Sequence, residues 1–471
     1  MKIKHQDIHI PSDPDGNPFI NCKLDRKKFA DILTNIITTY ADGFVLAVNN
    51  KWGAGKTTFI KMWSQDLKNK GFKTLYYNAW ENDFEKDVLI ALIAELKELQ
   101  NGAEESFKKV LNKATPFVSK ILPTLAKSLA STYIGDEFVK ELIAGIAEVS
   151  SKGLEEELKT YNKRKKGLKD FRGALEKFVS EASPDKPVVF FIDELDRCRP
   201  NYAVEVLEEI KHLFSVPGIV FVLSIDKEQL GHAVRGVYGS EKINAKEYLR
   251  RFIDLEYQIP RPNVQNFINY LYSYFNYEEF LEQPNRKIHQ EFSYDVDRFK
   301  VMSVRLFSGK EFELRQIEKI FAKIRLVLKG FSFNNFIFPE LILLIAYISE
   351  KHPSEFDKIQ RNQLSLQKFV DGLDIILEPL YDHPNRNQFY NLYGSFLWRY
   401  YLDYHKIHNY ARLKIYDPSE DNGPLIVKSK FENEDLLLAK AVRNANNAFN
   451  TSEIGLSWIF ERYNLTSNFQ S

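Results

Sequence analysis

Cysteine, methionine and long apolar runs are all scarce in this 471-residue chain. The two cysteines, Cys22 and Cys198, are too few for a disulfide framework or a cysteine-rich metal site, and they suit a reducing cytoplasm. The longest apolar run, at about Pro339–Ile348, is roughly half of the ~20 residues that a membrane-spanning helix needs. Residues 1–16 are polar. We therefore expect a cytoplasmic protein with no signal peptide and no membrane span.

Neither sign of charge dominates the chain. Its 65 Lys and Arg residues nearly balance its 64 Asp and Glu residues, so no global field points to nucleic acid or a membrane as partner. The sequence also lacks G-x-S-x-G, the motif of one large class of serine nucleophiles. An apolar fraction of 44% is ordinary for a soluble globular protein, and the length allows roughly two or three domains.

Residues 43–58, GFVLAVNNKWGAGKTT, have the pattern of a phosphate-binding P-loop (Walker A motif). The apolar run Phe44–Val48 predicts a buried strand, and an amphipathic segment through about Leu67 predicts the helix after the loop. Glycines let the backbone curl so that its N–H groups face phosphate oxygens at the helix N-terminus. Lys56 is expected to reach the β- and γ-phosphates and to act in catalysis. The residues assigned to nucleotide binding are Asn50, Lys51, Trp52, Gly53, Ala54, Gly55, Lys56, Thr57 and Thr58.

One position departs from the pattern G-x-x-x-x-G-K-[ST], because Asn50 stands where the first glycine is expected. Asparagine tolerates a positive φ better than other non-glycine residues, so we expect the loop to form. A chance turn with a surface lysine is the competing interpretation, and the strand and helix patterns on either side disfavour it.

A second motif, Val188–Arg197 with the sequence VVFFIDELDR, places carboxylates at the end of a predicted strand, as in a Walker B motif. Asp193 and Thr57 are expected to hold Mg²⁺, and Glu194 is expected to orient and deprotonate the attacking water. Two acids are needed because a carboxylate committed to the metal is a poor base. The sequence has no guanine-selecting N-K-x-D after a strand, so ATP is the expected nucleotide.

Short β-branched runs alternate with helical patterns along the first half of the chain. This alternation predicts an α/β fold in which helices cover both faces of a parallel sheet. Asp25–Tyr40 has helical periodicity and leads into the first strand. The predicted strands are Phe44–Val48, Lys73–Tyr77, Val188–Ile192, Ile219–Ile225 and Leu255–Ile259.

The separation of Lys56 and Asp193 is far greater than one βαβ unit requires. Most of the additional residues between the two motifs are predicted to form an insertion with helices at Pro123–Tyr133, Glu137–Ser151 and Leu154–Lys166. After about Pro262 the pattern becomes almost wholly helical, and its aromatic block Phe389–Tyr410 favours a helical core or subunit contact over a base-stacking surface. We expect an NTPase core in residues 1–101 and 169–262, a helical insertion in 102–168, a helical lid region in 263–335 and an all-α domain in 336–471.

Four further residues are weaker candidates for the site. Ser224, in FVLSID, lies at the end of a predicted strand and is a candidate γ-phosphate sensor, with ordinary strand-end chemistry as the equal alternative. Arg250 and Arg251 precede the fifth strand and could reach the phosphates of a neighbouring subunit as an arginine finger, or form a structural salt bridge. Arg315 lies in a predicted helix beyond the core and is a candidate for closing over the nucleotide.

Taken together, these motifs resemble the KAP family of P-loop NTPases. The resemblance rests on WGAGKTT from Trp52, on YNAW at Tyr77–Trp80 and on IDELDRCRP at Ile192–Pro200, and it covers roughly residues 20–330. It implies an NTPase with an extra strand between the P-loop and acidic strands, a catalytic acid and an insertion between the motifs. Several bacterial members of the family are linked to phage exclusion, which makes antiviral defence the implied process.

The leading hypothesis is an ATPase that couples Mg·ATP turnover to a conformational change or to assembly with protein partners or with itself. A second hypothesis is a nucleotide-gated scaffold with little turnover, which Asn50 supports and an intact Glu194 opposes. A third hypothesis is an ATPase stimulated by nucleic acid. The balanced charge of the chain makes this hypothesis less favoured. Phosphate release by the wild type, abolished by Lys56→Ala and Glu194→Gln, separates the first hypothesis from the second.

Overall fold

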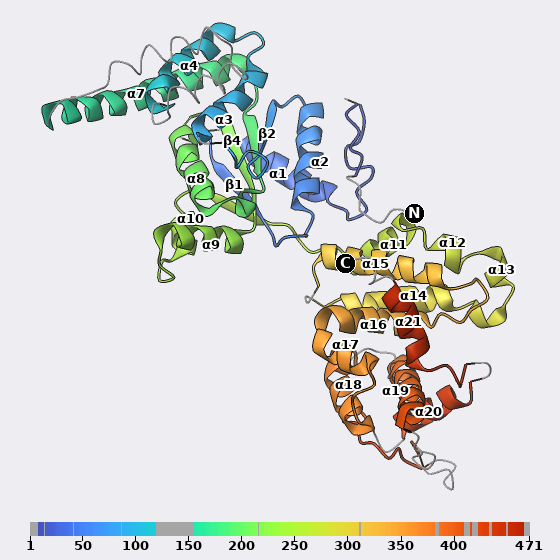
Figure 1. Cartoon of the computed structure of the whole chain (residues 1–471). Coiled ribbons are helices and arrows are strands. Elements are labelled where there is room, and N and C mark those ends of the chain that lie inside the picture. Colours follow the sequence, from blue (N-terminus) through green and yellow to red (C-terminus); the bar gives the residue numbers. More distant parts are fainter. Residues whose placement is uncertain are drawn as a thin grey trace. The chain divides into compact units, whose positions relative to one another are not determined.

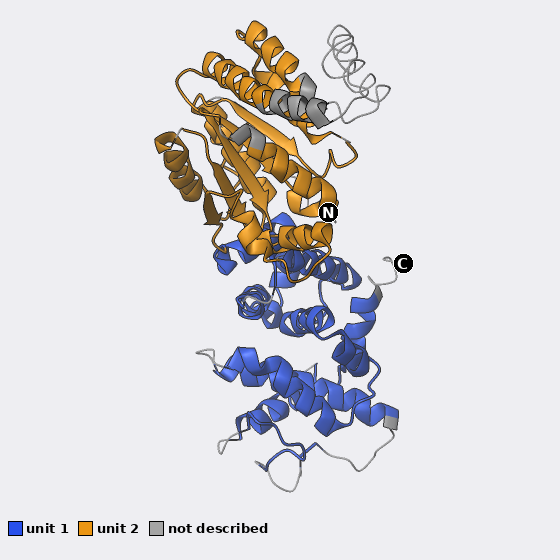
Figure 2. Ribbon diagram, turned by 90° about the vertical axis from the view of Figure 1, so that its left-hand side faces the viewer, with its two compact units in different colours: residues 1–6, 262–471 blue, residues 7–261 orange. Residues whose placement is uncertain are grey.

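A computed structural model describes residues 8–13, 15–40, 42–85, 87–118, 154–214, 216–309, 312–381, 386–408, 415–416, 423–432, 436–448 and 451–465. The chain forms two compact units, which are coloured separately in Figure 2. The first, here the N-terminal unit, comprises residues 7–261, and the second, the C-terminal unit, is built from residues 262–471.

The N-terminal unit is built on a five-stranded parallel sheet, as predicted. Its strands are β1 (Val45–Asn49), β2 (Thr74–Asn78), β3 (Val188–Asp193), β4 (Ile219–Ile225) and β5 (Leu255–Gln258). Their order is β2-β3-β4-β1-β5, and every neighbouring pair is parallel. Strand β4 therefore separates the P-loop strand β1 from the acidic strand β3, which is the arrangement that the family resemblance implies.

Helices cover both faces of this sheet because its inner strands are apolar on both sides. On one face, Leu46 and Val48 pack with α1 (Lys27–Thr39) and α2 (Lys56–Asn69), and Trp63 of α2 lies edge-on to Phe191 of β3. On the other face, Val45 and Ala47 join a core with α3 (Val88–Leu96), α8 (Pro200–Phe214) and α9 (Lys227–Tyr238) (Figure 1). Adjacent residues of β1 thus serve opposite cores, which fixes the register of the strand.

The predicted insertion is helical where the structure describes it. The short helix η1 (Lys97–Leu99) leads into α4 (Glu104–Val118), which packs along α7 (Leu154–Ala182) (Figure 1). A ring contact between Phe107 and Phe178, with centroids 5.3 Å apart, joins the two helices. Helix α7 includes the predicted Leu154–Lys166 and continues to Ala182. The predicted helices at residues 123–133 and 137–151 lie outside the described residues.

The described part of the C-terminal unit is almost wholly helical, as predicted. In α19 (Arg386–His408), most of the aromatic side chains of this block are buried, so they form a core within the unit rather than a base-stacking surface. The helices of this unit are α11 (Val264–Tyr274), α12 (Glu278–Leu281), α13 (Pro284–Lys287), η3 (Gln290–Phe292), α14 (Asp295–Phe307), α15 (Leu314–Val327), η4 (Leu328–Gly330), α16 (Pro339–Lys351), α17 (Pro353–Gln360), α18 (Leu366–Tyr381), α19 (Arg386–His408), α20 (Leu437–Asn446) and α21 (Leu456–Leu465).

Within the described ranges of both units, every helix falls short of the length and apolar character that a bilayer crossing would require.

Candidate nucleotide-binding site

The carboxyl ends of four neighbouring strands bring the predicted site together. The parallel register pairs Asn78 of β2 with Asp193 of β3, Asp193 with Ser224 of β4, and Ser224 with Val48 of β1. The P-loop leaves β1 directly after this row, and the β3–α8 connection leaves it on the other side of β4. In open parallel sheets, ligands bind outside the carboxyl ends of the strands, so the row defines the candidate site.

The P-loop has the backbone that phosphate binding requires. Gly53 and Gly55 adopt left-handed φ angles of 81° and 78°, and α2 begins at Lys56. The Lys56 ammonium is folded against the loop, where Nζ donates to the carbonyl oxygens of Asn50 at 2.7 Å and Lys51 at 3.3 Å. Burial lowers the pKa of Lys56, while Asp196, Asp226 and Asp193 oppose that shift. A lysine, loop N–H groups and a helix N-terminus therefore lie together.

Asn50 is accommodated differently from the expectation based on positive φ. It is absent from the described non-glycine residues that have a positive φ. Its side-chain Nδ2 donates to the Ile259 carbonyl oxygen at 2.8 Å, and its Oδ1 accepts from the Lys51 N–H at 2.8 Å. The asparagine thus ties the loop to the end of β5 through hydrogen bonds that glycine cannot make.

Thr57 and Asp193 supply the oxygen ligands that Mg²⁺ prefers. Thr57 is half-buried in the first turn of α2, and Asp193 is 1% exposed. Oδ2 of Asp193 accepts from the Tyr76 hydroxyl at 2.9 Å, while Oδ1 accepts from the Glu194 N–H at 2.9 Å. The same row holds Ser224, a fully buried hydroxyl that has no hydrogen-bond partner among the described residues. Hard oxygen ligands and an unsatisfied hydroxyl beside a P-loop fit Mg²⁺ and a polyphosphate.

Glu194 is held in a strained conformation. Its φ of 60° is left-handed, which costs a residue with a side chain of this size about 1 kcal/mol or more. Its Oε1 lies 2.7 Å from Nη1 of Arg197, and Nδ2 of Asn78 donates to Oε2 at 3.4 Å. Burial raises the pKa of Glu194, Arg197 opposes this, and Asp193 adds to it. Strain and a raised pKa are both typical of a catalytic carboxylate.

Asp196 is a contact of the P-loop that sequence reasoning missed. The indole N–H of Trp52 donates to Oδ2 of Asp196, which joins the loop to the turn after β3. Burial raises the pKa of Asp196, whereas the nearby Lys56 and the Trp52 hydrogen bond lower it. Asp196 and Arg197 both belong to the motif that carries the family resemblance, but strand and helix periodicity assign neither of them a role.

The segment around YNAW (Tyr77–Trp80) and the segment that follows β3 contact each other at several points. The hydroxyls of Tyr77 and Tyr202 are hydrogen-bonded to each other. The Arg197 guanidinium lies over the Trp80 ring, 5.8 Å from its centroid. Arg199 Nε donates to Asp83 Oδ1 at 2.9 Å. The loop after β2 is therefore fixed to the segment that carries Glu194.

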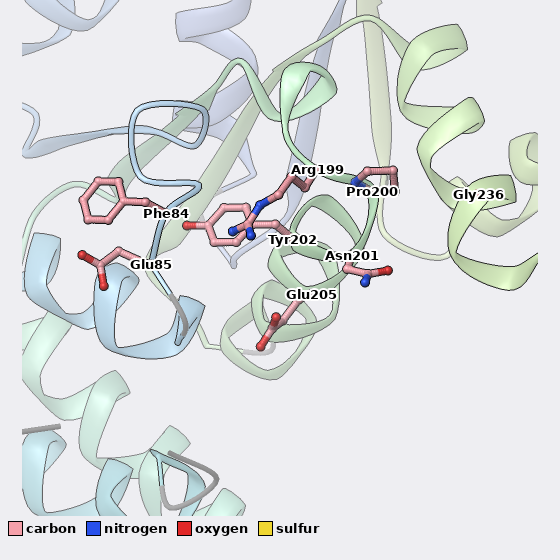
Figure 3. A pocket seen from close by; sticks show the side chains of 8 residues that line it. All are labelled: Phe84, Glu85, Arg199, Pro200, Asn201, Tyr202, Glu205 and Gly236. Atoms are coloured by element: carbon pink, nitrogen blue, oxygen red, sulfur yellow. The ribbon is translucent and has the colours of Figure 1, made fainter. Parts of the chain in front are cut away.

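A cavity of about 520 Å³ borders this junction (Figure 3). It is lined by Phe84, Glu85, Arg199, Pro200, Asn201, Tyr202, Glu205 and Gly236. These residues belong to the loop after β2, to α8 with the residue before it, and to α9. The candidate phosphate-binding site is defined by the P-loop and the strand-end acids, none of which lines this cavity.

Two of the three predicted arginines, Arg250 and Arg251, lie apart from the carboxyl ends of the strands. Arg250 and Arg251 are exposed near the amino end of β5, opposite to the edge that carries the P-loop, and Arg250 pairs with Glu247 at 3.0 Å. Their action across a subunit interface stays a prediction. Arg315 is exposed in the first turn of α15 in the C-terminal unit, and its role as a lid residue also stays a prediction.

Comparisons with known proteins match this chain to a P-loop family and to individual proteins. The family model described as the KAP family P-loop domain matches residues 26–374. The phage T7 exclusion protein of Escherichia coli (strain K12) is 23% identical over 272 residues, which are 52% of this chain and 34% of that protein. The chain therefore spans about a third of the length of this relative.

A solved structure of the Aeropyrum pernix ORC2 protein, in ADPNP–ADP complexes, is 12% identical in sequence. The match covers 94% of this chain and 86% of the ORC2 chain. Its TM-score of 0.31 is too low to carry an argument. The family match, by contrast, covers most of the chain and includes the P-loop, the acidic strand and the strand between them. The chain belongs to the KAP family of P-loop NTPases.

Proposed function

We propose that this protein binds Mg·ATP at the P-loop and hydrolyses it. The observation that carries the proposal is the placement of Lys56 within the P-loop next to the strand end that bears Asp193 and Glu194. In this assignment, Lys56 binds the β- and γ-phosphates, and the N–H groups at the start of α2 bind the phosphate oxygens. Asp193 and Thr57 hold Mg²⁺, which when bound neutralises charge on those oxygens.

Glu194 accepts the proton of the attacking water in this proposal. A carboxylate acts as a base only when it is ionised, and Arg197 favours that form. Asp193 is a poor base because its oxygens accept from Tyr76 and from the Glu194 N–H and would also hold the metal in this assignment. Ser224 lies on the strand between the P-loop strand and β3, and its hydroxyl, which has no partner in the described part of the chain, can donate to the γ-phosphate.

Phosphate release and nucleotide affinity test the proposal together. Lys56→Ala is expected to lose both phosphate release and nucleotide affinity. Lys61 is an exposed lysine of the same helix, and Lys61→Ala is expected to keep both properties. Glu194→Gln is expected to keep ATP affinity and to lose turnover by roughly 10²–10⁴-fold. Tight ATP binding by the wild type without phosphate release would overturn hydrolysis and support the nucleotide-gated scaffold instead.

The relative from Escherichia coli suggests the process that the ATPase serves. Because that protein is a phage T7 exclusion protein, we propose a role for this chain in exclusion of phage, exercised with protein partners or by self-assembly. Plaque counts on a host expressing the wild type should fall relative to the Glu194→Gln variant. Equal counts across a panel of phages would contradict the defence role while leaving the ATPase assignment intact.

A further inference from the structure

A buried arginine lies directly behind the P-loop. Arg26 precedes α1 and is only 3% exposed. Its Nη1 donates to the Gly55 carbonyl oxygen at 2.8 Å, and its Nη2 donates to the Ala54 carbonyl oxygen at 2.6 Å. One guanidinium therefore holds two successive peptide groups at the point where the P-loop enters α2.

Because the peptide bond is planar, fixing the direction of a carbonyl group also fixes the direction of the N–H in the same peptide group. In a trans peptide, the C=O and N–H groups point in opposite directions. The Ala54 carbonyl directed at Arg26 turns the Gly55 N–H away from the arginine, and the Gly55 carbonyl does the same for the Lys56 N–H. These N–H groups stand at the helix N-terminus, where the intrahelical ladder gives them no acceptor.

We propose that Arg26 is a positioning residue that orients the N–H groups of Gly55 and Lys56 toward the nucleotide phosphates. The inference rests on the proposed function, since it assigns the phosphates to this loop. It extends that function by adding a residue from outside both sequence motifs.

An arginine suits this position better than a lysine does. The planar guanidinium presents two donors in a fixed fork, which matches two neighbouring carbonyl oxygens, whereas an ammonium is a point charge on a flexible stem. The fit is close, because a Cβ added to Gly55 would lie 3.0 Å from Nη1 of Arg26. Gly55 is thus constrained both by its left-handed φ and by the arginine.

The burial of Arg26 also points to function. Burial lowers the pKa of the guanidinium, and among the described residues its Nε has no hydrogen-bond partner. A buried, incompletely satisfied charge is costly for stability. Behind a helix N-terminus, the same positive charge adds to the field that attracts an anion.

The experiment compares Arg26→Lys with a matched buried arginine. Arg325 of the C-terminal unit is 1% exposed, and its Nε donates to the carbonyl oxygens of Phe275 at 3.0 Å and Asn276 at 3.1 Å. Dissociation constants for ADP and ATP are measured on the full chain. Arg26→Lys is expected to weaken both by about 10- to 100-fold, as expected for disturbed charge-assisted hydrogen bonds. Arg325→Lys is expected to lower the thermal midpoint and to leave both constants unchanged.

Two further readouts separate positioning from a merely structural role. Because the N–H groups bind phosphate in the ground state and the transition state alike, Arg26→Lys should raise KM while changing kcat little. Without nucleotide, hydrogen exchange should rise in the peptide spanning residues 50–58 and stay unchanged in β3 and β4. If Arg26→Lys does not fold, Arg26→Gln, a neutral donor, takes its place in the same measurements.

The possible results distinguish the two proposals. Wild-type affinity for ADP in a folded Arg26 variant, or a rise in exchange throughout the N-terminal unit, would overturn the positioning role alone. Failure of the wild type to bind ADP or ATP would overturn the proposed function and the role of Arg26 with it.

Discussion

Nη1 of Arg197 lies 2.7 Å from Oε1 of Glu194, three residues earlier in the chain. The arginine also lies over the Trp80 ring, and the opposite carboxylate oxygen accepts from Asn78. The proposed base is therefore held by two polar groups, one from the loop after β3 and one from the end of β2. This arrangement fixes its orientation and affects its charge state.

Arg197→Gln is expected to shift the acid limb of kcat to higher pH. Burial already raises the pKa of Glu194 and the arginine opposes that rise, so its removal raises the pKa further. A base loses activity as pH falls through its pKa, and a higher pKa brings that loss at a higher pH. The measurement is kcat at saturating Mg·ATP between about pH 5 and about pH 9. Arg199→Gln, whose partner is Asp83, should leave the limb in place, and an unmoved limb in Arg197→Gln would argue against Glu194 as the base.

Glu194→Gly should be more stable than Glu194→Ala by about 1 kcal/mol, although both abolish hydrolysis. Both variants lose the Arg197 ion pair, but glycine alone removes the cost of the left-handed φ. Urea unfolding of the N-terminal unit measures the difference. At Glu176, an exposed position inside α7, the order should reverse, with glycine less stable than alanine by about 1 kcal/mol. The same order at both positions would refute the strain at Glu194.

Trp52→Phe is expected to lower the thermal midpoint of the N-terminal unit and to weaken ADP binding. The change deprives the buried Asp196 carboxylate of an indole donor, a loss of about 1–3 kcal/mol, and frees the loop from the turn after β3. Trp80→Phe is the matched control, since Trp80 is 53% exposed and Trp52 is 45% exposed. Equal effects of the two substitutions would mean that the Trp52 hydrogen bond is unimportant.

Asn50→Gly restores the usual P-loop glycine, yet it should destabilise the protein by about 1–2 kcal/mol without tightening ADP binding. It removes the hydrogen bonds to Ile259 and Lys51, each of modest net value. Asn50→Asp keeps the acceptor for the Lys51 N–H and loses the donor to Ile259, so its stability should lie between those of the wild type and Asn50→Gly. Tighter ADP binding by Asn50→Gly would contradict this description of the loop.

Ser224→Ala should change the stability by less than about 1 kcal/mol, because the buried hydroxyl has no partner to lose among the described residues. If this hydroxyl engages the γ-phosphate, kcat should fall at least about tenfold while ADP affinity stays constant. Ser64→Ala is the opposite control, since it loses a hydrogen bond to Thr74 and should reduce stability but not kcat. Unchanged turnover in Ser224→Ala would remove Ser224 from the site.

Local sequence patterns were sufficient for the strands and for choosing the candidate ligands that the strand ends and the P-loop carry. The predicted runs from Val188 and from Ile219 became β3 and β4 because strands buried on both faces appear as continuous apolar stretches. Lys56, Thr57, Asp193 and Glu194 were chosen as candidates because each stands at a fixed offset from a strand end or a glycine. The expectation for Asn50 was wrong in its mechanism, because the residue lacks a positive φ and its side chain donates to Ile259, more than two hundred residues away.

By itself, the sequence determined the P-loop, the acidic strand, the parallel α/β core and the family, since these depend on periodicity and on short-range spacing. Tertiary structure alone decided which groups hold those parts in place. Arg26 reaches carbonyl oxygens in the P-loop, Trp52 reaches Asp196 and Asn78 reaches Glu194. These partners are far apart in the chain, and their contacts depend on strand order and register. The spacing of residues along the chain does not predict which distant side chains the sheet will bring side by side.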